Sequence, residues 1–249
     1  MIRNKPKELR VINLTKWFGS LHVLDNISFN LNADEICGVV GPTGCGKTTL
    51  LNIISGIIPA TSGEVYLGDE KINPKKHKIA YIFQEESVFP FKTVRENIEF
   101  GLKIRGIPIG ERKKIVDEII DMLNLRDYEY FLPKNLSAAL KQLVVLGRAI
   151  AINPDIMLMD EPYGHLDAKT RRNFEDFIVE LKKKYGFPLL FVTHDIEEAV
   201  YVCDRIFVLT QKPARIKQEI KVELPRPRDL TDKRFTNIVN QIIELIRWW

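Results

Sequence analysis

The sequence predicts an α/β protein, on two observations. Short apolar segments alternate along the chain with amphipathic ones, and one apolar segment leads into a glycine-rich loop that opens a helix. This alternation is typical of folds in which helices cover a largely parallel sheet. The chain has 249 residues, of which 45% are hydrophobic and 28% charged. Such a chain can bury a large core within one domain, or within one domain that carries an inserted lobe.

The predicted strands are short and are spread over most of the chain. Their ranges are 9–13, 27–31, 36–40, 64–67, 79–83, 155–160, 188–193 and 205–209. Residues 94–151 differ, because apolar side chains recur there with helical spacing that is interrupted only at 106–110 and near Pro133. We interpret this stretch as an inserted helical lobe.

Residues 235–249 also predict an amphipathic helix. Two uses are open for its apolar stripe: packing against the chain's own core, or anchoring at a membrane surface or partner through Trp248 and Trp249. We favour the first, which is the commoner use of such a stripe.

The segment 41–49 is the most informative motif, with the sequence Gly-Pro-Thr-Gly-Cys-Gly-Lys-Thr-Thr. It fits the phosphate-binding pattern G-x-x-x-x-G-K-[ST] and lies between an apolar strand and a helix, as that pattern requires. The glycines let backbone N–H groups surround phosphate oxygens, and the helix N-terminus adds a partial positive charge. Lys47 is predicted to reach the β and γ phosphates, and Thr48 to place its hydroxyl on Mg²⁺. The predicted nucleotide-binding residues of this loop are Gly41, Pro42, Thr43, Gly44, Cys45, Gly46, Lys47, Thr48 and Thr49.

The composition argues against a nucleic-acid partner, a cysteine-bound metal and a membrane-spanning segment. The net charge of +4 is mild, and the basic runs at 112–114 and 182–184 lie in helical stretches, so we expect no nucleic-acid partner. Cys37, Cys45 and Cys203 show no metal-ligand spacing and suit a reducing compartment. The phosphate loop could lower the pKa of the Cys45 thiol, but we interpret Cys45 as a small loop residue. No apolar stretch is long enough to cross a bilayer, so any membrane crossing falls to another chain.

Two acids end the apolar strand at 155–160. Asp160 is predicted to hold Mg²⁺, directly or through water, as strand-end carboxylates beside a phosphate loop do. Glu161 points in a different direction along the strand and is predicted to polarise the water that attacks the γ-phosphate. The alternative is that both acids cap the next loop, beside Pro162.

Two further polar side chains follow strands. His194 comes directly after 188–193, and Gln84 comes after 79–83. Because the carboxyl ends of parallel strands share one sheet edge, we expect both near the phosphate loop. There His194 could hydrogen-bond the γ-phosphate, and the Gln84 amide could sense Mg²⁺ and the attacking water. Either residue alone is a weak indication.

In this order, the motifs resemble the nucleotide-binding subunit of an ATP-binding-cassette (ABC) transporter. The resemblance covers roughly residues 9–227. It implies that 41–49 is the Walker A loop, Gln84 the Q-loop glutamine, Asp160 the Walker B acid, Glu161 the catalytic glutamate, 164–167 the D-loop, His194 the switch histidine, and Phe18 the aromatic that stacks on adenine. Catalysis would then depend on Lys47, Gln84, Glu161 and His194, and Mg²⁺ binding on Thr48, Gln84 and Asp160.

The same resemblance implies the architecture. We expect one ABC ATPase domain with a P-loop NTPase, RecA-like core and an N-terminal antiparallel β subdomain, together in 1–92 and 152–215. An α-helical subdomain would occupy 93–151, and a C-terminal extension with the amphipathic helix would occupy 216–249.

The signature motif departs from the family pattern. Where the family has Leu-Ser-Gly-Gly-Gln, residues 136–140 are Leu-Ser-Ala-Ala-Leu. Ser137 is predicted to open a helix, so that its hydroxyl and the N–H groups up to Ala139 face the γ-phosphate held by the opposite subunit. If the backbone must approach that phosphate closely, the Ala139 methyl would cost on the order of 1–3 kcal/mol of closure. Since about 1.4 kcal/mol is a factor of ten, the rate would fall tenfold or more.

The resemblance implies an ATP- and Mg²⁺-dependent hydrolase that works as a dimer with a second copy or a related cassette. It would act at the cytoplasmic face of the cell membrane and drive import through separate transmembrane permease subunits, which would dock near Gln84 and 88–91. An apolar group such as 88–91 is also consistent with plain turn packing. Segments 193–200, 211–216 and 224–229 are similar to importers of the nitrate, sulfonate and taurine type, or of thiamine-pyrimidine cargo, which implies a separate solute-binding protein.

Other classes of function stay open at this point. The altered signature is consistent with a regulatory or weakly hydrolysing cassette in a heterodimer. A soluble ABC ATPase outside transport usually carries two cassettes, and this chain has room for one. A DNA-repair ATPase would need a long coiled-coil insertion, and no sustained heptads are present. A P-loop kinase would lack both the paired glutamate and the signature helix.

Overall fold

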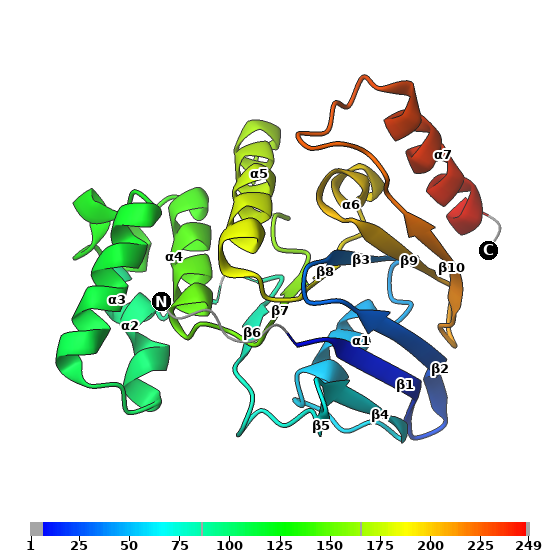
Figure 1. Cartoon of the computed structure of the whole chain (residues 1–249), viewed down its shortest axis with the longest axis horizontal. Coiled ribbons are helices and arrows are strands. Elements are labelled where there is room, and N and C mark those ends of the chain that lie inside the picture. Colours follow the sequence, from blue (N-terminus) through cyan, green and yellow to red (C-terminus); the bar gives the residue numbers. More distant parts are fainter. Residues whose placement is uncertain (1–6, 86, 165, 248–249) are drawn as a thin grey trace.

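The computed structural model describes residues 7–85, 87–164 and 166–247, and these form two sheets with helices around them (Figure 1). The larger sheet has the strand order β10-β9-β3-β8-β7-β6. Its strands are β3 (Ile36–Val40), β6 (Ile79–Ile82), β7 (Ile156–Asp160), β8 (Leu189–Val192), β9 (Arg205–Leu209) and β10 (Ile216–Lys221). All neighbours in it are parallel except β10, which pairs antiparallel with β9. The five parallel strands β9, β3, β8, β7 and β6 therefore end at the same edge.

The smaller sheet is antiparallel. Its order is β2 (Leu21–Leu31), β1 (Leu9–Phe18), β4 (Ser62–Leu67) and β5 (Glu70–Lys71). Strands β1 and β2 are longer than predicted, because their pairing continues through three register shifts out to Phe18 and Leu21. Period-two alternation breaks at such irregularities, so the sequence pattern showed only part of each strand.

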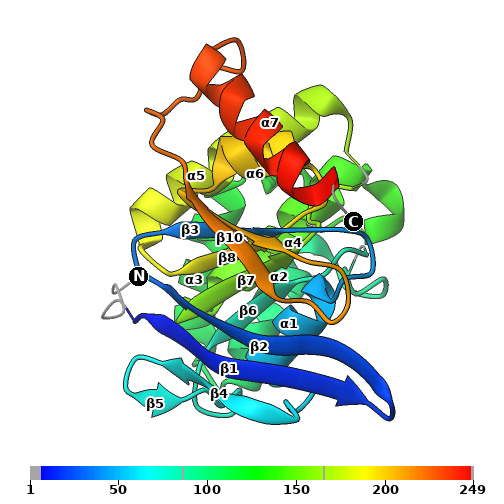
Figure 2. The same ribbon diagram turned by 90° about the vertical axis from the view of Figure 1, so that its right-hand side faces the viewer.

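Helix α1 (Lys47–Ile54) lies between the two sheets, as Figure 2 shows. Its apolar residues join one core with the inner faces of both sheets. The other face of the large sheet is covered by α5 (Ala168–Tyr185), α6 (Ile196–Val202) and α7 (Lys233–Arg247). Strands β3, β7, β8 and β9 are buried on both sides, which explains why these segments are continuously apolar rather than alternating.

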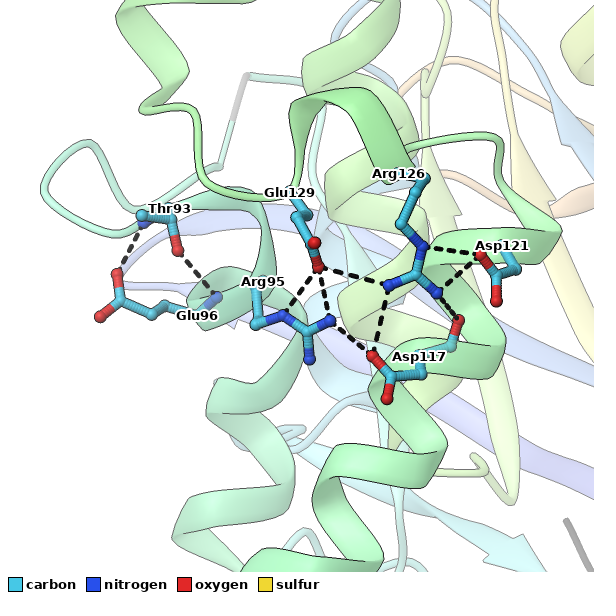
Figure 3. A network of polar contacts seen from close by, with 7 residues as sticks. All are labelled: Thr93, Arg95, Glu96, Asp117, Asp121, Arg126 and Glu129. Carbon is cyan, nitrogen blue, oxygen red and sulfur yellow. Dashed lines mark hydrogen bonds and ion pairs between the residues drawn. The ribbon is translucent and has the colours of Figure 1, made fainter.

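The helical lobe contains α2 (Val94–Ile104), α3 (Ile109–Met122) and α4 (Ala138–Ala151), with 3₁₀ turns at Arg126–Tyr128 and Pro133–Asn135. It has its own apolar core. Helix α2 begins with a capping box in which Thr93 and Glu96 exchange hydrogen bonds (Figure 3).

A network of charges joins the elements of this lobe (Figure 3). Arg95 of α2 forms ion pairs with Asp117 of α3 and with Glu129. Arg126 pairs with Asp121 of α3, and it also lies 3.5 Å from Asp117 and from Glu129. Exposed pairs contribute little singly, but Arg95 and Glu129 are mostly buried and share partners. The network therefore holds α2, α3 and the following 3₁₀ turn in one arrangement.

The C-terminal region is tied to the core. Strand β10 lies in the large sheet, so the core sheet continues beyond residue 215, where the sequence analysis ended it. Helix α7 buries Phe235, Val239 and Ile242 against the main core, so the favoured use of its apolar stripe is confirmed. Trp248 and Trp249 lie outside the described residues. None of the described helices is both long and apolar enough to cross a membrane.

Candidate active site

The site lies at the shared carboxyl edge of the parallel strands. The loop after β3 carries the predicted phosphate-binding residues. Glu161 directly follows β7, and Gln84 and His194 lie two residues after the ends of β6 and β8. These segments surround a pocket of about 690 Å³. The pocket is lined by Phe18, Leu21, Val23, Thr43, Gly44, Gly46, Lys47, Thr48, Thr49, Gln84, Glu161, His194 and Lys212.

Two glycines give the phosphate loop its shape. Gly46 has φ 127°, and a Cβ added there would lie 2.9 Å from Leu24 Cδ2. Gly44 has φ 75° and faces open space. The first intrahelical bond of α1 runs from Leu50 N to Gly46 O. The N–H groups at the start of the helix therefore have no intrahelical acceptor and are available to an anion.

Lys47 places a buried ammonium in this loop. The residue is 6% exposed, and its Nζ donates to Gly41 O at 2.9 Å and to Pro42 O at 3.1 Å. The described residues place no carboxylate within ion-pair distance of it. A buried cation that contacts only neutral carbonyls fits the binding of a phosphate chain, which would supply the missing negative charge.

Asp160 forms an oxygen-rich group with Thr48 and Tyr81. It is 3% exposed, accepts a hydrogen bond from the Thr48 hydroxyl, and lies 3.4 Å from the Tyr81 hydroxyl. Burial raises the pKa of the Asp160 carboxyl from its ordinary value, and the Thr48 hydrogen bond opposes this. A buried carboxylate beside a hydroxyl at the mouth of a phosphate loop fits Mg²⁺, a hard cation that prefers oxygen ligands. Thr48 and Asp160 could hold it.

The two remaining predicted residues, Gln84 and His194, both contact one carboxylate oxygen of Glu161. Glu161 Oε2 accepts from Gln84 Nε2 at 3.0 Å and lies 3.0 Å from His194 Nδ1. Glu161 has φ 45°, a left-handed conformation that is unusual for a residue with a side chain. Such backbone strain is found at functional sites, where surrounding contacts impose it. The carboxylate is therefore held in a defined orientation at the edge of the pocket.

The far wall of the pocket is apolar and comes from the tip of the β1–β2 hairpin. Phe18 is 47% exposed, and Lys16 Nζ lies 4.7 Å from the centre of its ring. Leu21 and Val23 line the same wall, and Lys212 faces the pocket from the loop after β9. The sequence did not predict Leu21, Val23 or Lys212 as site residues, because no local motif distinguishes them. An exposed aromatic face in a polar pocket is suited to stacking on a base, so the role of Phe18 stays a prediction that fits its position.

A family model described as ABC transporter matches residues 24–164. The chain belongs to the ABC transporter family. It is 39% identical over 244 residues to an uncharacterised ABC transporter ATP-binding protein of Methanocaldococcus jannaschii, covering 96% of this chain and 91% of that one. It is 35% identical over 230 residues to an aliphatic sulfonates import ATP-binding protein of Bacillus cereus, covering 92% and 90%.

A solved structure supports the same assignment. The dimeric structure of an ATP-binding cassette in a post-hydrolysis state, bound to ADP and Pi, matches with a TM-score of 0.75 and 31% identity over 86% of this chain and 99% of that one. The predicted fold class, a RecA-like core with an antiparallel β subdomain and a helical subdomain, is confirmed, and the chain is an ABC ATPase cassette.

The predicted signature segment, residues 136–140, does not line the pocket described above. Ser137 caps α4, accepting from Leu140 N at 3.3 Å, and is exposed, while Ala139 is half-buried. Neither lines the pocket described above. Gln142, one turn further, donates to Pro162 O at 2.7 Å and so connects this helix to the residue after Glu161.

Two smaller expectations can be compared with the structure. The thiol of Cys45 is buried, and burial raises its pKa, so the loop does not activate it; this agrees with its interpretation as a small loop residue. In the predicted D-loop, Asp167 caps α5 by accepting from Lys169 N and Thr170 N. His165 lies outside the described residues.

Proposed function

We propose that this cassette hydrolyses Mg²⁺-bound ATP to drive solute import, with Glu161 as the group that orients the attacking water. The observation that carries the proposal is the shared Oε2 of Glu161, held by Gln84 and His194 at the mouth of the phosphate pocket. Two side chains that follow the neighbouring strands β6 and β8 thus converge on one oxygen of the residue that follows β7. The relative bound to ADP and Pi supports hydrolysis as the reaction.

Each residue has a distinct part in this mechanism. The N–H groups of the phosphate loop and the Lys47 ammonium bind the phosphate chain, while Phe18 stacks on the adenine. Glu161 accepts a hydrogen bond from the attacking water and so directs the lone pair of the water oxygen toward the γ-phosphorus. His194 donates a hydrogen bond to the γ-phosphoryl oxygens as negative charge develops on them. Mg²⁺ held by Thr48 and Asp160, with Gln84 near it, would neutralise part of the phosphate charge.

A second copy completes the site in this proposal. Ser137 is exposed at the start of α4 and does not line its own pocket, so its hydroxyl and the helix N-terminus can face a phosphate held by another cassette. The dimeric relative supports this arrangement. The partner is a second copy or a related cassette. The alanines at 138 and 139 leave the N–H donors in place, because those donors belong to a regular helix.

An exposed aromatic group marks the docking surface that we propose for the permease. Of the segment predicted for docking, Phe89 packs against Phe100 and lies under Arg148, whereas Phe91 is 93% exposed. Tyr130 and Phe131 are 70% and 44% exposed, and Phe131 O accepts from Val94 N close to the same turn. Exposed aromatic side chains grouped in this way indicate an interaction site. The plain turn-packing alternative accounts for Phe89 but not for Phe91.

Cargo comes from the relatives alone. The sulfonates import relative supports an organic anion such as an alkyl sulfonate, delivered by a separate solute-binding protein to permease subunits, with this cassette at the cytoplasmic face of the membrane. Residues 193–200 and the segments after β9 carry the same resemblance.

Phosphate release by the purified chain, alone and with its co-purified permease, tests the proposal. Glu161→Gln is expected to bind ATP with unchanged affinity and to lower kcat by about 10²–10³-fold, as the loss of a group that acts only in the transition state does. Lys47→Ala is expected to weaken ATP binding itself. Wild-type turnover by Glu161→Gln would refute the assignment of Glu161. A wild-type chain that binds ATP without releasing phosphate, even with the permease, would instead identify a regulatory cassette.

A further inference from the structure

His194 is held in place largely by its neighbours. Its own side chain is 63% exposed, and the contact that the structure gives it is the one to Glu161. Such an exposed imidazole loses rotational freedom when it is fixed toward a phosphate. The orientation of His194 therefore depends on the backbone that carries it, from Thr193 to Asp195.

Both residues that flank His194 are bound by the first turn of α6. The Thr193 hydroxyl donates to Glu198 Oε2 and accepts from Asp195 N at 3.0 Å. Asp195 caps the helix, since its Oδ1 accepts from Glu198 N at 3.1 Å. Glu198 therefore contacts the residue before His194 through its side chain and the residue after it through its backbone.

The placement of Glu198 is costly for the fold. The residue is 6% exposed, and Thr193 is 1% exposed. A carboxyl group in such a place loses its hydration, so its burial there points to a specific use rather than simple packing. Burial raises the pKa of Glu198 to about 8, which leaves it protonated at neutral pH. A neutral carboxyl group fits this position beside the Thr193 hydroxyl.

A small chamber of about 80 Å³ lies behind the His194 loop. Its walls include Glu161, His194 and Glu198, so it borders both the catalytic carboxylate and its support. Two buried donors that also line it, the Tyr163 hydroxyl and Arg171 Nε, have no hydrogen-bond partner among the described residues. The volume and these donors suit one or two ordered waters. Arg171 also pairs with Asp195 at 3.2 Å, which supports the same loop from α5.

We infer that Glu198 is a positioning residue for catalysis: through Thr193 it holds the His194 loop in the orientation in which the imidazole meets Glu161 and the γ-phosphate. This inference rests on the proposed role of His194. It assigns a function to a buried acid that lies outside the nucleotide pocket.

Steady-state phosphate release over a range of ATP concentrations tests the inference in the full-length chain. Glu198→Ala is expected to lower kcat at least tenfold while the KM for ATP stays within about twofold, because binding depends on the phosphate loop. Glu198→Gln keeps a neutral side chain with an oxygen acceptor for Thr193 and is expected to stay within about threefold of wild type. Glu197→Ala, the exposed neighbour in the same helical turn, is the matched control and is expected to leave turnover unchanged.

A second variant covers the case in which Glu198→Ala does not fold. Thr193→Val is close in shape, removes the hydroxyl, and is expected to lower kcat as Glu198→Ala does. In the double variant the two losses should not add, because both remove the same link. Additive losses, or a wild-type kcat in Thr193→Val, would overturn the inference.

The pH profile adds a readout that a purely structural role would not move. The charged and titratable groups around Glu198 are Arg171 and Glu175 on α5, Asp195 at the start of α6, Glu161 and Tyr163 after β7, and His194 after β8. Wild-type kcat is expected to fall as pH rises through about 8, because ionised Glu198 repels Glu175 and Asp195, the second of which directly follows His194. Glu198→Gln is expected to keep its kcat over that range. Identical alkaline limbs would count against the inference.

His194→Ala separates this inference from the proposed function. If His194→Ala turns over as wild type does, the role of His194 is wrong and the proposed mechanism fails with it. If His194→Ala loses turnover and folded Glu198→Ala does not, the proposed function stands and only the positioning role of Glu198 is refuted.

Discussion

The buried carboxyl of Glu198 makes the stability of this cassette depend on pH in a direction that can be calculated. In the unfolded chain the group titrates near its ordinary value of 4.5, whereas burial raises its pKa to about 8 in the folded protein. The folded state thus binds one more proton than the unfolded state between these two values. Because the folded pKa is the higher one, the stabilisation is complete below pH 4.5 and is lost as the pH rises through about 8.

The magnitude follows from the size of the pKa difference. Each pH unit inside the window lowers the free energy of unfolding by about 1.4 kcal/mol for one such group. Between about pH 6 and about pH 7.5, Glu198 alone should therefore cost roughly 2 kcal/mol. Glu175, whose pKa burial raises to about 7, adds a smaller loss that ends at a lower pH.

Urea unfolding followed by circular dichroism at these two pH values measures the effect. Between these pH values the free energy of unfolding of the wild type should fall by roughly 2 kcal/mol more than that of Glu198→Gln, and its urea midpoint should fall accordingly. The variant cannot ionise at this position and keeps only the contribution of Glu175. Glu197→Ala again serves as the control, because its side chain is exposed. If wild type and Glu198→Gln lose stability in parallel, Glu198 is already ionised in the folded state at neutral pH, and the reasoning fails.

Three further variants test other parts of the fold. Gly46→Ala forces a left-handed φ on alanine and drives a methyl into Leu24, so it should cost roughly 2–4 kcal/mol in urea unfolding and weaken ATP binding in a nucleotide titration. Arg228→Met removes the buried donor to carbonyls at the end of α6, including Val200 O and Cys203 O, and should cost about 3–5 kcal/mol in the same unfolding assay. Asp160→Asn should raise the Mg²⁺ concentration needed for half-maximal phosphate release at least tenfold.

Each of these variants has a control in the same chain. Gly106→Ala, also at positive φ but with open space around it, should lose only the cost of the φ angle, and equal losses at both glycines would show that the contact with Leu24 is unimportant. Arg247→Met removes an exposed arginine and should have little effect. An unchanged Mg²⁺ requirement in Asp160→Asn would remove Asp160 from the metal site.

Local sequence identified those parts of the site in which neighbouring residues act together. The phosphate loop is contiguous because glycine conformations, a lysine and a helix N-terminus must be consecutive to surround a phosphate. Asp160, Glu161, His194 and Gln84 were found because each follows an apolar strand, and parallel strands bring such residues to one edge. The short apolar strands and the amphipathic lobe showed the fold class for the same reason: burial determines where apolar side chains recur along the chain.

Other features depend on residues that are far apart in the chain and became visible only in three dimensions. Leu21, Val23 and Lys212 carry no motif, and the sheet topology alone brings them to the pocket. Gln84 and His194 converge on one oxygen of Glu161 because β7 lies between β6 and β8 in the sheet. The three residues themselves are well separated in the sequence. The acid Glu198 resembles its exposed neighbour Glu197 in sequence, and only the tertiary packing of α6 buries one of them.

By itself, then, the sequence determined the chemistry that this cassette can bring to a triphosphate, because that chemistry resides in short contiguous motifs. The tertiary structure decided how those motifs face one another, which acids lose their water, and that Ser137 lies away from its own pocket. The physical reason is that hydrogen bonding and burial between distant segments depend on the strand order and the packing of helices on the sheet. No local window of the chain contains that information.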